Sequence, residues 1–159
     1  MTDEREMHDK DVYFIKNGLT VDHLLPGTGG MVKHIIGVKP TSSYDGFHSE
    51  KHGKKDRVTV PIEGFHLTDD QKLMIALVSP RNTISEIEGG EAHAKYHARV
   101  PDEIRGHIEC PNDNCITNAQ DEDSRAYVEE RNGEDRPETF RCHYCETPFG
   151  KEELKFTFL

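Results

Sequence analysis

The sequence has few apolar residues and no long apolar run. Apolar residues make up 33% of its 159 residues and charged residues make up 31%, so any core is small. No stretch approaches the roughly 18 apolar residues that a membrane span requires. The first residues, Met1 to Glu6, are charged and lack the apolar core of a signal peptide. We therefore expect a cytoplasmic protein of one or two small domains that has no membrane partner.

Basic residues are scarce, most of all near the C-terminus. The chain has 20 Lys and Arg against 30 Asp and Glu, which gives a net charge of -10. Residues 100–159 hold 15 acidic and 7 basic side chains, a net charge of -8. Because phosphate contacts require Lys and Arg on the binding face, we expect no nucleic-acid partner. The cationic groups that could meet a smaller anion belong to residues 1–99.

Cysteine is absent from the first 109 residues and then occurs in two close pairs. Cys110 and Cys115 are separated by four residues, Cys142 and Cys145 by two, and 26 residues lie between the pairs. In a reducing cytoplasm such pairs indicate metal ligands rather than disulfides. Four thiolates around one ion are typical of a structural Zn²⁺ site. We therefore predict one structural Zn²⁺ bound by all four cysteines.

Motifs of catalysis are also missing. The sequence has no nucleophile elbow and no Gly-Lys-Thr loop that would cradle a phosphate. A zinc ion with four thiolate ligands has no open position for a reacting water. We expect a protein that is not an enzyme and has no catalytic residues.

Residues 1–99 alternate between strand and helix patterns. Thr68-Asp69-Asp70-Gln71 is a capping box before a helix that Pro80 ends. Residues 39–57 are the least regular part, and the following strand should lie at an edge or stop at Pro61. We predict an N-terminal ferredoxin-like α/β sandwich in the α+β class. Strands are expected at residues 12–15, 19–24, 58–62, 83–87 and 92–99, and helices at 31–36 and 68–78.

Residues 100–104 are typical of a hinge, so we predict domains at 1–99 and 100–159. Short strands are expected around the cysteines, at 106–109, 125–129, 139–141 and 155–158. The Asn132-Gly133 turn fits a hairpin between two of them. The C-terminal part is therefore expected to be a small β-rich four-cysteine zinc domain.

Several motifs along the chain form a recognisable set. The wide gap of the first cysteine pair holds Pro111-Asn112-Asp113-Asn114, and the second pair frames His143-Tyr144. The N-terminal part contributes Ile15-Lys16-Asn17-Gly18, a Gly-Lys-Lys-Asp loop at 53–56, and Leu67-Thr68-Asp69-Asp70-Gln71, and Ser79-Pro80 and Val100-Pro101-Asp102-Glu103-Ile104 follow. Together these motifs resemble those of one family, the regulatory chain of aspartate carbamoyltransferase. The resemblance covers roughly residues 11–159.

The resemblance implies a non-catalytic regulatory subunit of pyrimidine biosynthesis. In that family the N-terminal domain dimerises and binds CTP or ATP allosterically, and the zinc domain docks on the catalytic chain. Two catalytic trimers are joined by three regulatory dimers. We therefore expect three kinds of partner: the catalytic chain, a second copy of this chain, and CTP or ATP as effectors.

The resemblance also implies site residues. It implies nucleotide contacts at Asp22, His23, Lys55 and Lys95, which suits a triphosphate and a ribose hydroxyl. It implies a partner interface at three residues on the cysteine knuckles, Asn114, Tyr144 and Glu146. The sequence departs from the family pattern at 37–52, where the family's second strand is not recognisable. A lysine expected near Thr59 or Pro61 and a tyrosine expected near Gly90 are also absent.

Other interpretations remain open. The chain could be a zinc-ribbon module for protein interaction, or a stand-alone small-molecule sensor that has lost nucleotide allostery. His93 and His97 lie four residues apart, which on a helix would allow both to hold one metal. Because the segment is expected to be extended, we predict that both are ordinary polar residues on one sheet face.

Overall fold

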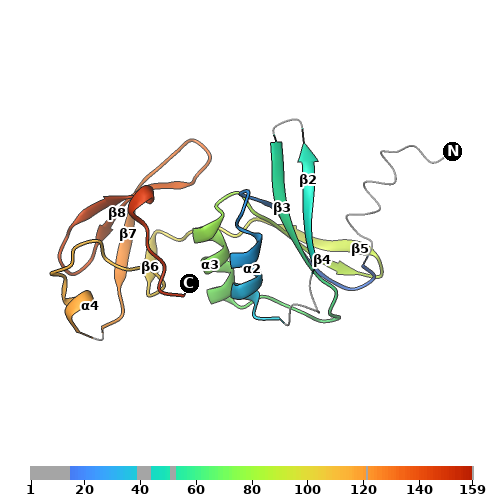
Figure 1. Cartoon of the computed structure of the whole chain (residues 1–159), viewed down its shortest axis with the longest axis horizontal. Coiled ribbons are helices and arrows are strands. Elements are labelled where there is room, and N and C mark those ends of the chain that lie inside the picture. The colour runs from blue at the N-terminus through green and yellow to red at the C-terminus, as the bar shows by residue number, and fades with distance from the viewer. Residues whose placement is uncertain (1–14, 39–43, 51–52, 121, 159) are drawn as a thin grey trace. The chain divides into compact units, whose positions relative to one another are not determined.

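The computed structural model describes residues 15–38, 44–50, 53–120 and 122–158 (Figure 1). The chain divides into two compact units, Met1–Ala98 and Arg99–Leu159. Within the described ranges, no helix combines the length and the apolar character that crossing a membrane would take.

The first unit is an antiparallel sheet with two helices side by side on one face (Figure 1). Its strands lie in the order β2-β3-β1-β4-β5. The first four strands and the two helices follow the βαββαβ order of a ferredoxin-like sandwich, and β5 extends the sheet at one edge, so the predicted fold class is confirmed. The elements are β1 (Gly18–Leu24), α2 (Gly29–Ile36), β2 (Tyr44–Glu50), β3 (Gly53–Val60), α3 (Asp69–Val78), β4 (Thr83–Glu88) and β5 (Glu91–Tyr96).

Alternation along the central strands sends apolar side chains to the helix-covered face. Leu19 and Val21 of β1 and Ile84 of β4 are fully buried there. The predicted capping box begins α3: the Thr68 hydroxyl accepts from the Gln71 amide at 3.1 Å, and the Gln71 side chain accepts from the Thr68 amide at 2.9 Å. Gln71 Nε2 also donates to the carbonyls that end α2. One side chain therefore starts one helix and caps the other.

The expectation of an irregular segment over residues 39–57 is wrong for its described part. Residues 44–50 form β2, which pairs along its length with β3. The strand β2 lies at the edge of the sheet, and its sequence carries almost no hydrophobic pattern. As predicted, β3 stops before Pro61. The strand predicted at 12–15 falls almost entirely outside the described residues.

The second unit is a four-stranded antiparallel sheet in the order β6-β7-β8-β9. The hairpin predicted from Asn132-Gly133 joins β7 and β8, through a five-residue loop at 132–136 whose turn lies at Gly133 and Glu134. The strands predicted at 106–109 and 155–158 are wrong as strands, because only a single bridge between Ile108 and Phe156 forms there. The elements are β6 (Glu103–Arg105), α4 (Ile116–Ala119), β7 (Arg125–Arg131), β8 (Pro137–Cys142), β9 (Pro148–Gly150) and the 3-10 helix η2 (Lys151–Glu153).

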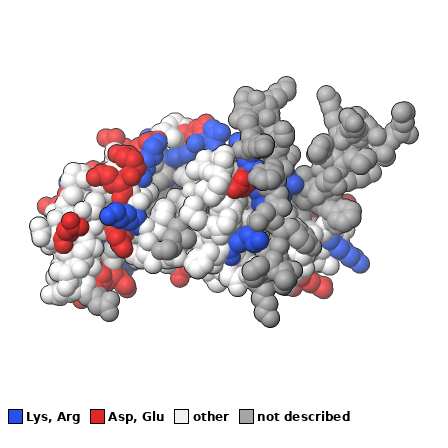
Figure 2. Space-filling model, in the orientation of Figure 1, with Lys and Arg blue, Asp and Glu red and all other residues white. Residues whose placement is uncertain are grey.

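This sheet has a small aromatic core and many ion pairs on its surface. Phe140 is fully buried and stacks on Phe149 with ring centroids 5.4 Å apart. Acidic and basic side chains interleave along its surface (Figure 2), and Arg125 is bonded to Glu103 across β6 and β7 at 2.6 Å. Such exposed pairs contribute little each, typically below about 1 kcal/mol.

Candidate metal centre and polar sheet face

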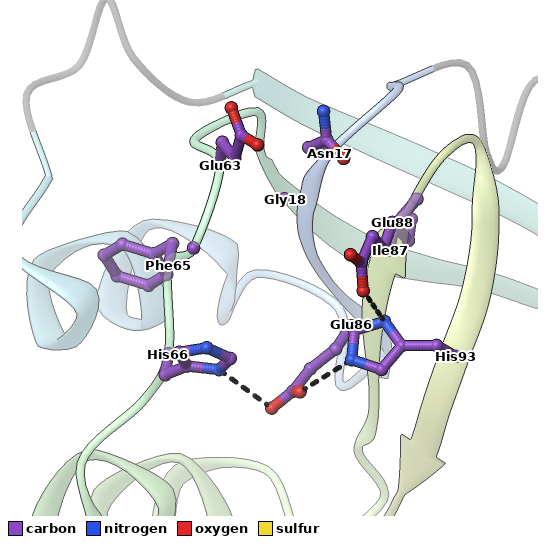
Figure 3. A pocket seen from close by; sticks show the side chains of 10 residues that line it. Asn17, Gly18, Glu63, Phe65, His66, Glu86, Ile87, Glu88 and His93 are labelled. Atoms are coloured by element: carbon purple, nitrogen blue, oxygen red, sulfur yellow. Dashed lines mark ion pairs between the residues drawn. The ribbon is translucent and has the colours of Figure 1, made fainter.

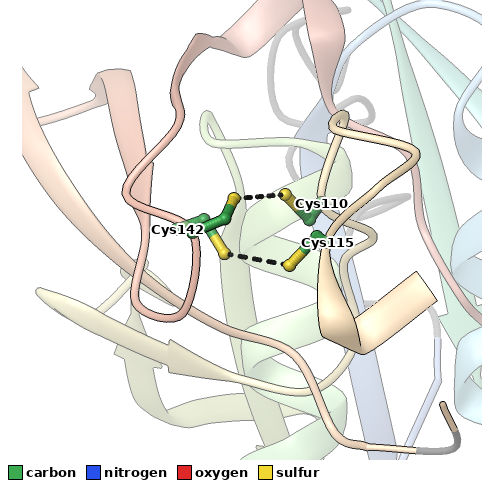
Figure 4. Close-up of side chains that lie close together, drawn as sticks. Cys110, Cys115 and Cys142 are labelled. Carbon is green, nitrogen blue, oxygen red and sulfur yellow. Dashed lines mark hydrogen bonds between the residues drawn. The ribbon is translucent and has the colours of Figure 1, made fainter. Parts of the chain in front are cut away.

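The four cysteine sulfurs converge on one point in the second unit (Figure 4). All four Sγ atoms lie within 4.8 Å of one another. The Sγ atoms of Cys110 and Cys145 are 3.5 Å apart, and those of Cys115 and Cys142 are 3.8 Å apart. A tetrahedral zinc with bonds of about 2.3 Å to sulfur gives edges of about 3.8 Å. A disulfide would need about 2.05 Å, so these free thiols fit a metal ion and not a disulfide.

The sequence around the first pair explains why the chain bends there. Asn112 accepts from the Asn114 amide through its side chain and from the Cys115 amide through its carbonyl. Asn118 Nδ2 donates to the carbonyls of Cys110 and Asn112, both at 2.8 Å. Asparagine favours such side-chain-to-backbone turns, which here direct both thiols inward.

The second knuckle is a tight turn at the end of β8. The Glu146 amide donates to the Cys142 carbonyl at 3.1 Å, and Glu146 itself takes a φ of 59°. The Cys142 amide donates to the Thr147 carbonyl at 3.0 Å. Cys142, at the end of β8, lies with its Sγ 3.8 Å from that of Cys115 on the first knuckle.

Burial and local hydrogen bonds shift the pKa values of three of the thiols. Burial raises the pKa of Cys110 and the pKa of Cys142 above the usual value of a thiol. Burial also acts to raise the pKa of Cys145, but hydrogen bonds with Thr147, Cys110 and Asn112 together outweigh burial and bring that pKa to about 6. Buried thiolates need a compensating positive charge, which a divalent ion supplies.

The three predicted interface residues lie at the surface of the knuckles. Asn114 is on the first knuckle, and Tyr144 and Glu146 are on the second; all three are exposed. Tyr144 packs edge-on against His143, whose Nδ1 lies 2.7 Å from the Tyr127 hydroxyl. Ile116 is also exposed beside Cys115, a residue that the sequence analysis did not select. Aromatic and apolar groups on a polar surface are typical of interface anchors.

The predicted nucleotide contacts belong to the first unit, on the sheet face that does not meet the helices. Strand register aligns Thr59, Thr20, Ser85 and Lys95 in one row across β3, β1, β4 and β5. Asp22 lies two residues beyond Thr20, so it shares this face. Lys55 is on β3 and half-buried, not on the loop that its motif suggested, and Lys95 is exposed.

Asp22 does not stand alone on this face. Arg57 Nη2 donates to Asp22 Oδ2 at 3.0 Å, and the His23 amide donates to Asp22 Oδ1 at 2.9 Å. Burial acts to raise the pKa of Asp22, but the hydrogen bond and charge of Arg57 and the hydrogen bond from the His23 amide together leave the pKa below its usual value. His23 has a φ of 58° and its Nδ1 lies 3.0 Å from Thr83 Oγ1. The structure thus brings together Asp22, His23 and a cation that the sequence analysis missed.

Arg57 could have been found from strand alternation. It is two residues from both Lys55 and Thr59, so the three share one face of β3. Thr20 Oγ1 on the same face is buried and has no hydrogen-bond partner in the part of the chain that the structure describes. We define this set as the polar sheet face: Thr20, Asp22, His23, Lys55, Arg57, Thr59, Thr83, Ser85 and Lys95.

Two family models match the two units in order. Residues 10–99 match the model described as aspartate carbamoyltransferase regulatory chain, allosteric domain, and residues 102–155 match the metal binding domain of the same chain. Curated relatives carry the name aspartate carbamoyltransferase regulatory chain. The protein of Methanocaldococcus jannaschii is 37% identical over 143 residues, covering 88% of this chain and 92% of its own. That of Pyrococcus horikoshii is 34% identical over 154 residues, covering 93% and 97%.

The chain therefore belongs to the family of aspartate carbamoyltransferase regulatory chains. The relatives are named as regulatory chains, so the chain is a non-catalytic subunit, as predicted.

Proposed function

We propose that this chain is a zinc-dependent regulatory subunit that docks on the catalytic chain of aspartate carbamoyltransferase through its cysteine knuckles. The observation that carries the proposal is the convergence of four sulfurs at the spacing of a tetrahedral zinc site, in the unit that matches the family's metal binding domain. Zn²⁺ is the proposed ion, because a closed set of four thiolates is its typical structural site. Reduced thiols also agree with the predicted cytoplasmic location.

The bound ion would act through structure, not through chemistry at an open site. Cys110, Cys115, Cys142 and Cys145 would hold it, and the two knuckles would then be fixed relative to each other. Asn114, Tyr144 and Glu146 would thereby be presented as one surface to the catalytic chain. Tyr144, which is 45% exposed, is the proposed anchor of that surface.

Binding of the zinc-loaded chain to its host's catalytic trimer tests the docking surface. We expect Tyr144→Ala to weaken binding at least tenfold, which corresponds to about 1.4 kcal/mol. Glu146→Ala should weaken it less, and Glu130→Ala serves as its matched control, since Glu130 is an exposed glutamate on β7 away from the knuckles. Equal affinity of the wild type, Tyr144→Ala and Glu146→Ala would contradict the proposed surface.

We also propose that the polar sheet face binds a nucleoside triphosphate such as CTP or ATP, and that the N-terminal unit dimerises. Lys55, Arg57 and Lys95 supply positive charge for phosphates, and Asp22 and His23 supply hydrogen-bonding groups for base or ribose. Arg57 provides a cation on the strand where the lysine expected near Thr59 is absent. A coupling of about 1–3 kcal/mol to the catalytic chain would be typical of allostery.

Calorimetry with CTP tests this second part. Lys95→Ala should weaken CTP binding, whereas Lys33→Ala on α2, in the helix layer, should leave it unchanged. Unchanged affinity in Lys95→Ala would place the site elsewhere.

One observation favours a chain that scaffolds without sensing nucleotides: the Asp22 carboxylate is already engaged by Arg57. If wild-type protein binds neither CTP nor ATP while still docking on the catalytic chain, this alternative holds.

A further inference from the structure

We propose that His66, Glu86 and His93 form a second metal site, separate from the cysteines, which takes a divalent transition-metal ion. The three side chains line a cavity of about 310 Å³ in the first unit (Figure 3). They come from three places in the chain: the segment before α3, the strand β4 and the strand β5. This site lies on different residues from the proposed nucleotide contacts.

Glu86 lies between the two imidazoles. Its Oε1 is 3.5 Å from His66 Nδ1, and its Oε2 is 3.5 Å from His93 Nε2 (Figure 3). Both contacts are ion pairs when the imidazoles are protonated. The two imidazoles meet different oxygens of one carboxylate, so the three side chains lie close together although their ligand atoms do not yet converge on one point. A divalent ion can take the place of the imidazole protons, because neutral imidazole and carboxylate are both typical ligands.

A bulge in β5 directs His93 toward Glu86. Ile87 pairs with Ala92 and Glu86 pairs with Ala94, so His93 is the extra residue on β5. Such a bulge redirects a side chain that regular alternation would have sent to the other face. The side chain of His97 lies on that other face, where its Nδ1 is 2.6 Å from the Asn82 carbonyl oxygen. The expectation that His93 and His97 share one face is therefore wrong.

Charge and a supporting hydrogen bond also favour a cation. The cavity is lined by Glu63, Glu86 and Glu88, and no Lys or Arg is among its described lining residues. The Tyr96 hydroxyl donates to Glu86 Oε1 at 3.4 Å. An outer residue that orients a ligating carboxylate is the usual companion of a metal site.

The ligand set decides the class of ion. Two imidazoles and one carboxylate suit Zn²⁺, Ni²⁺ or Cu²⁺ rather than Mg²⁺ or Ca²⁺, which prefer oxygen alone. Among the described residues, the four cysteines are the only group whose ligand atoms already lie together, within 4.8 Å of one another. His66 and His93 must therefore rotate inward on binding, which their side-chain exposures of 65% and 46% allow. Water would complete the coordination of so open a site.

Titration of tag-free, zinc-loaded, full-length chain with NiCl₂ at neutral pH tests the proposal by calorimetry. We expect one Ni²⁺ site per chain, with affinity lowered at least about tenfold in His66→Ala and in His93→Ala, since even loss of an outer-shell partner costs 10–100-fold. The matched control is His34→Ala, because His34 is an exposed histidine on α2 that does not line the cavity. Its affinity should equal that of the wild type.

A second measurement, which does not depend on affinity, locates the bound ion. Bound Ni²⁺ is paramagnetic, so amide NMR signals of residues 63–66, 86–88 and 93 should broaden first. Tyr96→Phe should weaken Ni²⁺ binding without abolishing it, as expected of a positioning residue. Absence of Ni²⁺ binding in the wild type, equal binding in His66→Ala and His34→Ala, or broadening centred elsewhere would each overturn the proposal.

Discussion

The two units of this chain reach stability by different means. The first buries aliphatic side chains of its sheet against two helices, including Leu19, Ile75 and Ile84. The second has a much smaller described apolar core, centred on Ile104 and Phe140, and gathers three buried cysteines and a fourth half-buried one instead. A domain this small usually needs a staple, and the cysteine cluster occupies the place of one. Neighbouring units of one chain can therefore be organised around different centres. The first is built around buried apolar side chains, and the second around a cysteine cluster that suits a metal ion.

Removing a metal ligand should have the largest effect on stability, and it should affect only the second unit. In Cys142→Ser the second unit should lose its zinc and unfold, because structural zinc sites contribute about 10–16 kcal/mol of apparent binding free energy. The measurement is zinc content together with amide NMR dispersion. Signals from residues 15–38 and 53–98 are the internal control and should stay dispersed. A folded second unit with a full zinc content would contradict the ligand assignment.

A substitution in the apolar core of the first unit should lower the stability of that unit alone. Ile75 is fully buried on α3, so Ile75→Ala should lower the free energy of unfolding of this unit by about 2–5 kcal/mol. Urea denaturation followed by residue-specific signals measures this, and the zinc content should not change. Leu25→Ala is the control, since Leu25 is 42% exposed and its loss should cost within about 0.5 kcal/mol. Equal effects of the two variants would mean that α3 does not hold this core.

A smaller effect should come from the start of α3. Thr68→Ala removes the hydroxyl that accepts from the Gln71 amide and should destabilise the first unit by about 1 kcal/mol. Thr68→Ser retains a capping hydroxyl and should remain close to the wild type. If both substitutions cost the same in urea denaturation, the cap does not contribute through its hydroxyl.

Lowering the pH should destabilise the first unit through its Asp22–Arg57 pair. The pKa of Asp22 lies below its usual value in the folded unit, so its stabilising contribution is present above the unfolded pKa and is lost as pH falls through the folded pKa. Stability of the first unit measured from pH 6 to pH 2 should therefore decline, and Asp22→Asn should flatten the decline. An unchanged slope in Asp22→Asn would show that this carboxylate does not carry the effect.

Much of the fold was predictable from local patterns. The capping box, the stop at Pro61 and the Asn132-Gly133 hairpin each depend on residues adjacent in the sequence. The edge strand β2 was not predictable, because pairing with β3 fixes it and its own residues carry almost no apolar alternation. The bulge at His93 was likewise hidden, since it arises from register between β4 and β5.

The sites show the same division. Close cysteine pairs reveal a metal site directly, because both ligands of each pair lie within one turn. The Asp22–Arg57 contact and the meeting of His66 with Glu86 join residues 35 and 20 positions apart. Only the three-dimensional arrangement of the strands brings such residues together.

The most direct test of the account is the assembly state of this chain with the aspartate carbamoyltransferase catalytic chain of its host. The two chains are co-expressed and the product is analysed by size-exclusion chromatography with light scattering, before and after removal of zinc by a chelator. The account predicts one species of about twelve chains, as the family resemblance implies, which dissociates when zinc is removed. Separate elution of the two chains with zinc present would contradict the proposed subunit role.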